Sequence, residues 1–169
     1  MKATVIYDSL YGNTQKIAQA VAEALRQALG PQAEVNVLRI TEARPEQLSG
    51  LDLLVAGSPT QRFRPTLPVM DFLKSLPPNS LKGVKAAAFD TRLTQQEIKK
   101  TSVLAFFVRL AGSGAWAAPY IAKGLKKGGA SLLLPPEGFT VEGMEGPLSE
   151  GELERAVRWA GQVAAGLVG

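Results

Sequence analysis

The chain has 169 residues, of which 46% are hydrophobic and 20% are charged, and it carries a net charge of +4. This length suits one domain, so we expect residues 1–169 to form a single globular domain. The chain contains no Cys and no His. These absences exclude disulfides, thiolate metal sites, Cys nucleophiles, imidazole bases and most zinc or haem sites. We therefore expect no metal site and no catalytic side chain of these types, and reactivity would have to come from other polar groups or from an organic cofactor.

Short apolar runs rich in β-branched residues predict five strands, at 3–7, 35–40, 51–56, 84–89 and 130–134. Helical spacing of apolar residues predicts helices at 14–29, 66–76 and 116–127, and a final helix from 149. In that final helix, Leu153, Val157, Ala160 and Ala164 are expected to share the buried face. The segment 93–115 has no clear pattern and carries no prediction.

Strands that alternate with helices predict a parallel sheet that is buried on both faces and joined by right-handed crossovers. The expected fold class is therefore α/β, a doubly wound three-layer sandwich. In such sheets ligands bind beyond the carboxyl ends of the strands, where the strand order reverses. The polar, turn-like segments that follow the first, third and fourth strands should converge on one crevice.

The first of these segments has the features of an anion site. Gly12 allows a sharp turn, and the amides of Gly12, Asn13 and Thr14 would point back toward it from the start of a helix. Hydroxyl groups of Ser9, Tyr11 and Thr14 could add hydrogen bonds to a phosphate. No Lys or Arg lies between residues 8 and 15, so neutralisation would rest mainly on dipoles. An ordinary strand-to-helix turn, capped by Ser9 or Asn13, is the alternative.

Two common phosphate-loop patterns do not fit this segment. The P-loop pattern G-x-x-x-x-G-K-[ST] requires a Lys directly after its last glycine, and Gly12 is followed by Asn13. The dinucleotide-binding pattern G-x-G-x-x-G requires three glycines, and only one is present. The run S-L-Y-G-N-T at 9–14 instead resembles the phosphate loop of the flavodoxin family. The run G-S-P-T from Gly57 resembles that family's second flavin-flanking loop. The run F-D-T-R at 89–92, and the segment 136–156, resemble one group of flavodoxin-like proteins. Together the matches span residues 5–160.

This resemblance implies a flavodoxin-like fold with strand order 2-1-3-4-5 and FMN as the cofactor. Residues that match the family's loops are the expected FMN-binding residues. They are Ser9, Leu10, Tyr11, Gly12, Asn13 and Thr14 at the phosphate, and Pro59, Thr60, Gln61, Arg62, Phe63, Asp90, Thr91 and Arg92 near the flavin ring. Backbone groups of the second and third loops would hydrogen-bond the ring.

Three functions remain open at this point. The leading one is electron transfer through the bound flavin, with redox proteins as transient partners. The second is an FMN-dependent NAD(P)H:quinone-type oxidoreductase, in which an arginine of the loops receives the substrate. The third is an interaction module that binds no flavin, because fold alone does not determine function.

Two features depart from the family's electron carriers, which are acidic and stack the flavin between aromatic rings. This chain is basic, and its second and third loops contain neither Trp nor Tyr. Other aromatic residues could stack on the ring, but core packing is favoured for each of them: Phe63, Phe106, Phe107, Trp116 and Tyr120. Arg62, Arg64 and Arg92 should lie near the ring and make its reduction easier.

The N-terminal segment has no charged and apolar regions typical of a secretion signal, so a cytoplasmic location is expected. The apolar window 103–120 is interrupted by Arg109, Gly112, Gly114 and Pro119, which argues against a transmembrane helix. For its residues Leu104, Phe106, Phe107 and Leu110, core or lid packing is favoured over a peripheral surface role. Dispersed Lys and Arg residues without interleaved aromatics make nucleic-acid binding a weak interpretation.

Overall fold

A computed structural model describes residues 1–169, apart from the side chain of Pro45. The strands are β1 (Lys2–Tyr7), β2 (Glu34–Arg39), β3 (Leu53–Pro59), β4 (Lys85–Leu93), β5 (Ser131–Leu132) and β6 (Glu137–Val141). The helices are α1 (Asn13–Leu29), α2 (Leu67–Ser75), α3 (Gln95–Lys99), α4 (Ser102–Ala111), α5 (Ala117–Lys127) and α6 (Glu152–Val168), with short 3-10 helices η1 (Pro45–Leu48) and η2 (Gly112–Ala115).

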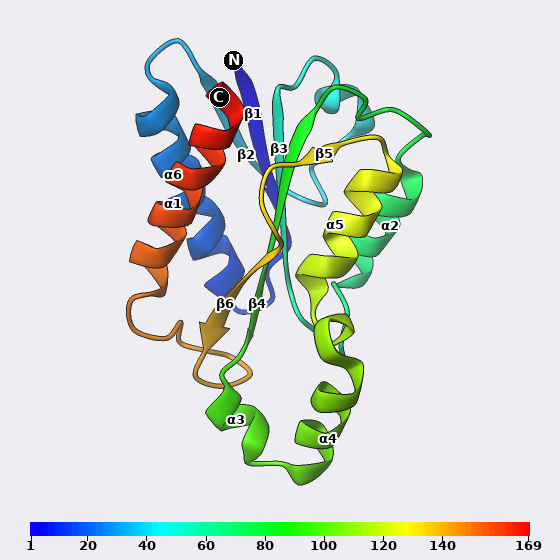
Figure 1. The fold of residues 1–169 in the computed structure, drawn as a ribbon, viewed down its shortest axis with the longest axis vertical. Coiled ribbons are helices and arrows are strands. Elements are labelled where there is room, and N and C mark those ends of the chain that lie inside the picture. Colours follow the sequence, from blue (N-terminus) through cyan, green and yellow to red (C-terminus); the bar gives the residue numbers. More distant parts are fainter.

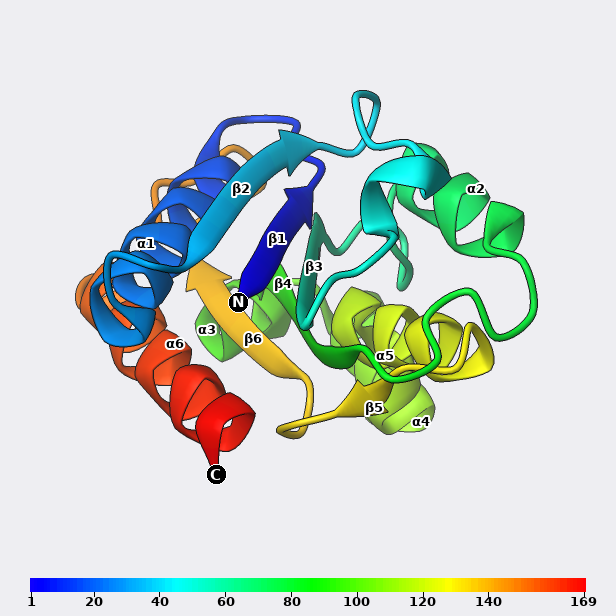
Figure 2. The ribbon, with the colours of Figure 1, turned by 90° about the horizontal axis from the view of Figure 1, so that it is seen from above.

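The sheet is parallel, with the order β2-β1-β3-β4-β5, and β6 pairs with β4 beyond the end of β5. Helices α1 and α6 lie on one face of the sheet and α2 and α5 on the other, so the chain forms three layers (Figures 1 and 2). This arrangement confirms the predicted doubly wound α/β fold and its strand order.

Each face of the sheet buries its own apolar cluster. Under α1 and α6, Phe89 of β4 packs edge-on against Phe139 of β6 and Trp159 of α6, with ring centroids 6.0 Å apart in both pairs. Under α2 and α5, aliphatic side chains such as Leu54 and Ile121 are fully buried. The strands are apolar on both faces because both faces are covered.

The predicted fifth strand is present but shorter than expected, and a strand that was not predicted follows it. β5 pairs only with Lys85 and Ala86 of β4, whereas β6 pairs with β4 from Phe89 to Leu93. Pro135 and Pro136 separate the two short strands. Proline has no N–H group to donate, so the sheet pairing is interrupted at this point.

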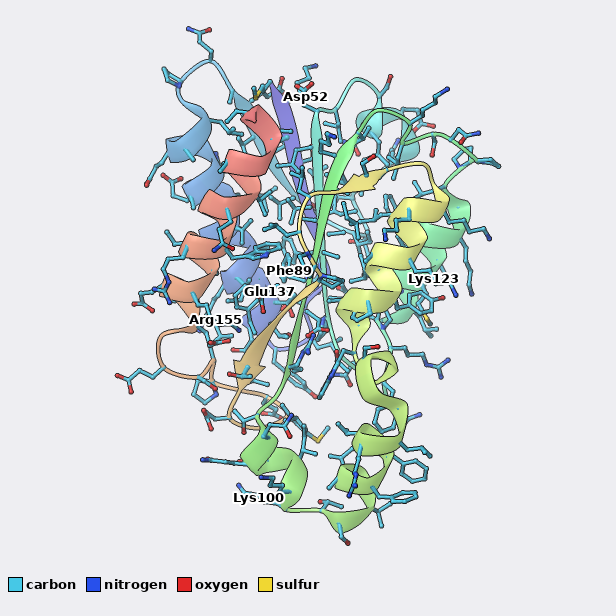
Figure 3. The ribbon with its side chains drawn as sticks, in the orientation of Figure 1. Asp52, Phe89, Lys100, Lys123, Glu137 and Arg155 are labelled. Atoms are coloured by element: carbon cyan, nitrogen blue, oxygen red, sulfur yellow. The ribbon has the colours of Figure 1, made fainter. Side chains whose placement is uncertain are left out.

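A charged contact joins β6 to α6, where Glu137 and Arg155 lie close together (Figure 3). Arg155 donates from Nη1 to Glu137 Oε1 over 2.8 Å, and from Nη2 to Glu152 Oε2 over 2.7 Å. Its guanidinium also lies 4.5 Å from the centroid of the Phe139 ring. This side chain therefore helps to hold the last helix against the last strand.

Two details of the helices differ from expectation. In α6, Ala160 and Ala164 are buried as predicted, but Leu153 and Val157 are exposed, and Trp159 and Val163 are buried instead. The segment 93–115 contains α3, α4 and η2 and projects beyond the carboxyl ends of the strands (Figure 1). Phe106, Phe107 and Leu110 are therefore exposed and not packed in the core, while Leu104 is half-buried.

Candidate functional site

A cleft with a volume of about 300 Å³ opens at the carboxyl ends of β1, β3 and β4. It lies where the strand order reverses, between β1 and β3. The flavodoxin fold is the standard example of a ligand site at such a point. Ten of the predicted site residues line the cleft: Leu10, Tyr11, Asn13, Thr14, Pro59, Thr60, Gln61, Arg62, Thr91 and Arg92.

The first loop presents free backbone donors at the start of α1. Gly12 precedes the helix in a left-handed conformation with φ of 86°, and its amide donates to Ser9 Oγ over 3.0 Å. Within the part of the chain that the structure describes, the amides of Asn13, Thr14 and Gln15 have no acceptor. These donors at the positive end of a long helix create an environment suited to an anion.

Two side chains of the same loop tie it to distant segments. The hydroxyl groups of Thr14 and Thr91 form a buried hydrogen bond of 2.8 Å, which links α1 to β4. Asn13 Nδ2 donates to the carbonyl of Glu145 over 2.9 Å, which links α1 to the segment between β6 and α6. The loop is therefore held in place by contacts from the middle of the chain and from the segment before α6.

The first loop also contacts a cation that is far from it in the sequence. Arg39, at the end of β2, donates to the carbonyl of Ser9 over 2.7 Å and lies 3.6 Å from the carboxylate of Asp8. Because Asp8 is buried, this arginine balances a carboxylate directly beneath the loop. The pairing leaves the neutralisation of a bound anion mainly to dipoles, as the sequence indicated.

The second segment, after β3, forms a tight two-residue turn. The amide of Gln61 donates to the carbonyl of Arg64 over 2.8 Å, and the reverse bond measures 3.1 Å. Between them, Arg62 and Phe63 both have positive φ, at 48° and 68°. Such a turn usually holds Asn or Gly, so two large side chains here indicate local backbone strain at the edge of the cleft.

The third segment is not a loop, which corrects the sequence-based expectation. Phe89, Asp90, Thr91 and Arg92 all lie within β4, because β3 and β6 continue the sheet on its two sides. Thr91 and Arg92 line the cleft, whereas Asp90 lies beneath it and is completely buried.

Asp90 and Arg92 form a bidentate ion pair, with Nε–Oδ1 and Nη2–Oδ2 distances of 2.6 and 2.8 Å. The amide of Ala118 also donates to Asp90, over 2.8 Å. The Arg92 guanidinium lies 4.5 Å from the centroid of the Trp116 ring, and on another side it contacts Gly138 so closely that a Cβ there would overlap it. Burial raises the pKa of the Asp90 carboxyl, while the hydrogen bonds and the charge of Arg92 oppose that rise.

Four predicted site residues do not line the cleft. Ser9 and Gly12 form the backbone turn below it, Asp90 holds Arg92, and Phe63 lies at the rim. Conversely, Leu93, Val141 and Met144 line the cleft and were not predicted. Val141 lies in the segment 136–156, whose sequence resembles flavodoxin-like proteins, but this residue was not predicted to line the site.

The aromatic candidates for ring stacking are not core residues, which corrects that expectation. Phe63, Phe106, Phe107 and Tyr120 are exposed, and Trp116 is half-buried beneath Arg92. Among the described residues that line the cleft, Tyr11 is the single aromatic one. The cleft is therefore walled mainly by polar and aliphatic groups.

A second cavity, of about 280 Å³, adjoins the cleft and shares Thr60, Arg62 and Leu93 with it. Its other walls are apolar: Phe63, Ile98, Leu104, Val108, Ala115 and Trp116. Leu104 and Val108 of α4 thus face an apolar hollow beside the candidate site. An apolar hollow of this kind can accept a planar apolar molecule.

A family model described as Flavodoxin matches residues 5–159. The chain belongs to the flavodoxin family. A flavodoxin of Aquifex aeolicus is 44% identical over 59 residues, which cover 35% of this chain and 31% of the relative. The solved structure of a flavodoxin from Archaea has a TM-score of 0.73 at 20% identity, with complete coverage of both chains, which supports the flavodoxin fold.

A longer match, at lower identity, is with a protein that bears an enzyme's name. An NAD(P)H dehydrogenase (quinone) of Geotalea uraniireducens is 25% identical over 99% of this chain and 97% of the relative. The relatives of this chain thus include a protein named flavodoxin and a protein named NAD(P)H dehydrogenase (quinone).

Among the described residues, no three Asp or Glu side chains are grouped closely enough to hold a metal ion. None of the described helices combines the length and apolar character needed to cross a bilayer.

Proposed function

We propose that the chain binds FMN in this cleft and transfers electrons through the bound flavin. The observation that carries this proposal is the convergence of three strand ends on one cleft beside unpaired amides of α1. When bound, FMN supplies the one- and two-electron chemistry that the side chains of this chain lack. The proposal includes one flavodoxin-like domain over residues 1–169, membership of the group that carries F-D-T-R, and a cytoplasmic location.

The residues at the two ends of the cleft suit the two ends of FMN. At one end, the amides of Asn13, Thr14 and Gln15 would donate to the phosphate, and the Thr14 hydroxyl is fixed by Thr91. At the other, Pro59, Thr60 and Gln61 after β3 would flank the ring together with Thr91 and Arg92. The Asp90–Arg92 pair would keep that wall in one geometry.

Titration of the protein with FMN, followed by quenching of flavin fluorescence, tests this proposal. Riboflavin, which lacks the phosphate, serves as the second ligand. Gly12→Ala should weaken FMN binding at least tenfold and riboflavin binding much less, because a Cβ strains the left-handed turn that aims the amides. Failure of the unaltered protein to bind FMN at micromolar concentration would refute the assignment.

Gly151→Ala is the matched control for that variant. Gly151 precedes α6 with φ of 80° and ψ of −1°, close to the values of 86° and −10° at Gly12, and a Cβ has open space at both positions. Both variants therefore carry the same backbone strain at a helix start. Only Gly12→Ala should change the affinity for FMN.

The second candidate function is that of an FMN-dependent NAD(P)H:quinone-type oxidoreductase. The apolar cavity that shares Arg62 and Leu93 with the cleft favours it, as does the similarity to the Geotalea protein along nearly the whole chain. Under the leading proposal the partners are redox proteins, and under this one they are NAD(P)H and a quinone; nucleic acid is a partner under neither. Steady-state oxidation of NADPH and NADH by a soluble quinone separates the two, since turnover below about 0.1 per second indicates a carrier.

A further inference from the structure

The outward face of α4 is built of large apolar side chains that nothing in the structure covers. Val103, Phe106, Phe107 and Leu110 are 62%, 62%, 47% and 73% exposed. Their spacing of three, four and seven residues places them on one face of the helix. Soluble surfaces seldom group large apolar residues in this way, so the face indicates a contact with something apolar.

The opposite side of the same helix is already used by the fold. Leu104 and Val108 are half-buried and line the apolar cavity beside the cleft. None of the residues of α4 is fully buried. The helix is thus attached along one side, while its outer face adds no packing to either core cluster.

Four basic side chains lie close to α4. Lys99 of α3 and Arg109 of α4 line the same hollow between the two helices, and Arg62 and Arg64 lie on the neighbouring turn. Among the described side chains, no carboxylate lies within 4.0 Å of these four cations. Lys100, at the outer tip of the molecule, is paired with Glu97 (Figure 3).

We propose that α4 docks the protein onto the surface of a bilayer rich in anionic lipid. The apolar face would enter the headgroup region, and Lys99, Arg109, Arg62 and Arg64 would contact anionic headgroups. An amphipathic helix bordered by cations, on a chain with a net charge of +4, matches that surface in both polarity and charge.

The size and placement of the face favour a bilayer over a protein partner. A helix of ten residues is about 15 Å long, and four side chains on it offer far less than the roughly 800 Å² that each partner of a stable protein complex buries. The face also lies on a projecting element at the end of the molecule (Figure 1). A bilayer needs no matching groove, so a small projecting apolar face is sufficient for weak, reversible binding.

Docking in this orientation would turn the candidate site toward the lipid. The ring centroids of Phe107 on α4 and Phe63 on the neighbouring turn are 6.4 Å apart. Phe63 and Arg62 in turn line the cavity that adjoins the cleft. The apolar face therefore continues into the mouth of the site, although the docking itself does not depend on a bound flavin.

Sedimentation with sucrose-loaded vesicles tests the proposal with the whole chain. Vesicles of phosphatidylcholine with about 30% phosphatidylglycerol are compared with vesicles of phosphatidylcholine alone. We expect the protein to bind the anionic vesicles at millimolar lipid, with affinity that falls as salt rises, and to bind neutral vesicles at least tenfold more weakly. Absence of binding to the anionic vesicles overturns the proposal, and a protein would then be the expected partner of the apolar face.

Matched variants locate the contact. Phe106→Ser with Leu110→Ser should lower vesicle affinity at least tenfold, whereas Leu153→Ser with Val157→Ser, at exposed apolar positions of α6, should not. Lys99→Gln with Arg109→Gln should lower it about fivefold per cation, and Lys123→Gln with Lys127→Gln on α5 should lower it much less. Equal losses in the test and control pairs overturn the assignment to α4.

Sedimentation equilibrium of the free protein tests the remaining alternative, that a second copy of this chain packs against the apolar face of α4. We expect a monomer over the concentration range of the vesicle assay. A dimer that dissociates in the Phe106→Ser, Leu110→Ser variant would overturn the proposal, since the face would then pair two copies. Circular dichroism confirms that each variant is folded before either assay.

Discussion

At the scale of single residues, the charged contacts of Glu152 make a measurable contribution to stability at neutral pH. Burial alone would raise the pKa of Glu152, but the hydrogen bond from Arg155, the 2.6 Å hydrogen bond from the amide of Thr140 and the charge of Arg155 outweigh it, so the pKa lies below its ordinary value. A carboxyl with a lowered pKa stabilises the fold above its unfolded pKa and loses that effect as pH falls through the folded value. Glu152→Gln should therefore cost about 2 kcal/mol at pH 7.

Urea denaturation at pH 7 and at pH 3 measures that difference. The stability gap between the unaltered protein and Glu152→Gln should shrink as the pH falls below about 4.5, the ordinary value for a glutamate. Glu154→Gln, two residues further along α6 at an exposed position, is the control and should change stability by less than about 0.5 kcal/mol at either pH. A gap that stays constant with pH would contradict the role given to the carboxylate charge.

The arginines near the site differ in the charge that they present to a bound flavin. The charge of Arg92 is offset by buried Asp90, whereas Arg62 lines the cleft and has no carboxylate within 4.0 Å among the described side chains. Arg64 does not line the cleft. Of the three cations expected to ease reduction, Arg62 is therefore the one that should influence the potential most.

Arg62→Gln should make the two-electron midpoint potential of bound FMN more negative by about 20 to 50 mV, because removal of an exposed cation disfavours added negative charge. Spectroelectrochemistry measures the shift. Arg158→Gln, at an exposed position of α6, removes the same charge far from the cleft and should leave the potential unchanged. A midpoint potential that neither substitution changes would show that solvent screens the charge of Arg62 from the flavin.

At the scale of elements, β6 shapes the site through the absence of a side chain at Gly138. The Arg92 guanidinium occupies the space where a Cβ would lie, so Gly138→Ala should push Arg92 away from Trp116 and cost about 2 kcal/mol. Urea denaturation measures the loss, and a change in Trp fluorescence reports the displacement. Gly161→Ala, in open space on α6, should instead stabilise the protein by about 0.5 to 1 kcal/mol.

Local sequence predicted most helices and strands, but not the strand pairings that determine where some of them end. The apolar runs at residues 3–7 and 14–29 correspond closely to β1 and α1. The F-D-T-R run was expected in a loop because strand 84–89 ends there by its apolar pattern. Its continuation within β4 is paired with β3 on one side as far as Thr91 and with β6, almost 50 residues later, on the other, and no local pattern reports such pairings. The exposed apolar face of α4 escaped prediction for a related reason, since periodicity shows that a face exists and not what covers it.

At the scale of the whole molecule, stability should rest on the two sheet faces and hardly at all on the projecting segment. Phe89→Ala would leave a cavity among Phe139 and Trp159 and should cost about 3 to 5 kcal/mol. Phe106→Ala on α4 removes a ring of the same size from an exposed position and should cost less than about 0.5 kcal/mol. Chemical denaturation of the two variants measures both losses of stability. Equal losses would contradict this expectation and show that α4 is part of the cooperative core.

The architecture as a whole could be predicted because the alternation of strands and helices and the resemblance of several motifs agree. Ten of the fourteen predicted site residues line the cleft, since strand ends at a switch point converge by topology alone. Leu93, Val141 and Met144 could not be predicted, because their place depends on how β6 and the following segment fold over the first loop.

The hydrogen bond from Asn13 to Glu145 joins residues 132 positions apart. A growing chain that has exposed the first loop therefore lacks one wall of the cleft until residues 141–145 have also been made. Contacts of such long range also form late, because a large loop must close before they do. Flavin capture would then coincide with the last steps of folding, so a fluorescent flavin added to a translating ribosome would report finished molecules and ignore partial ones.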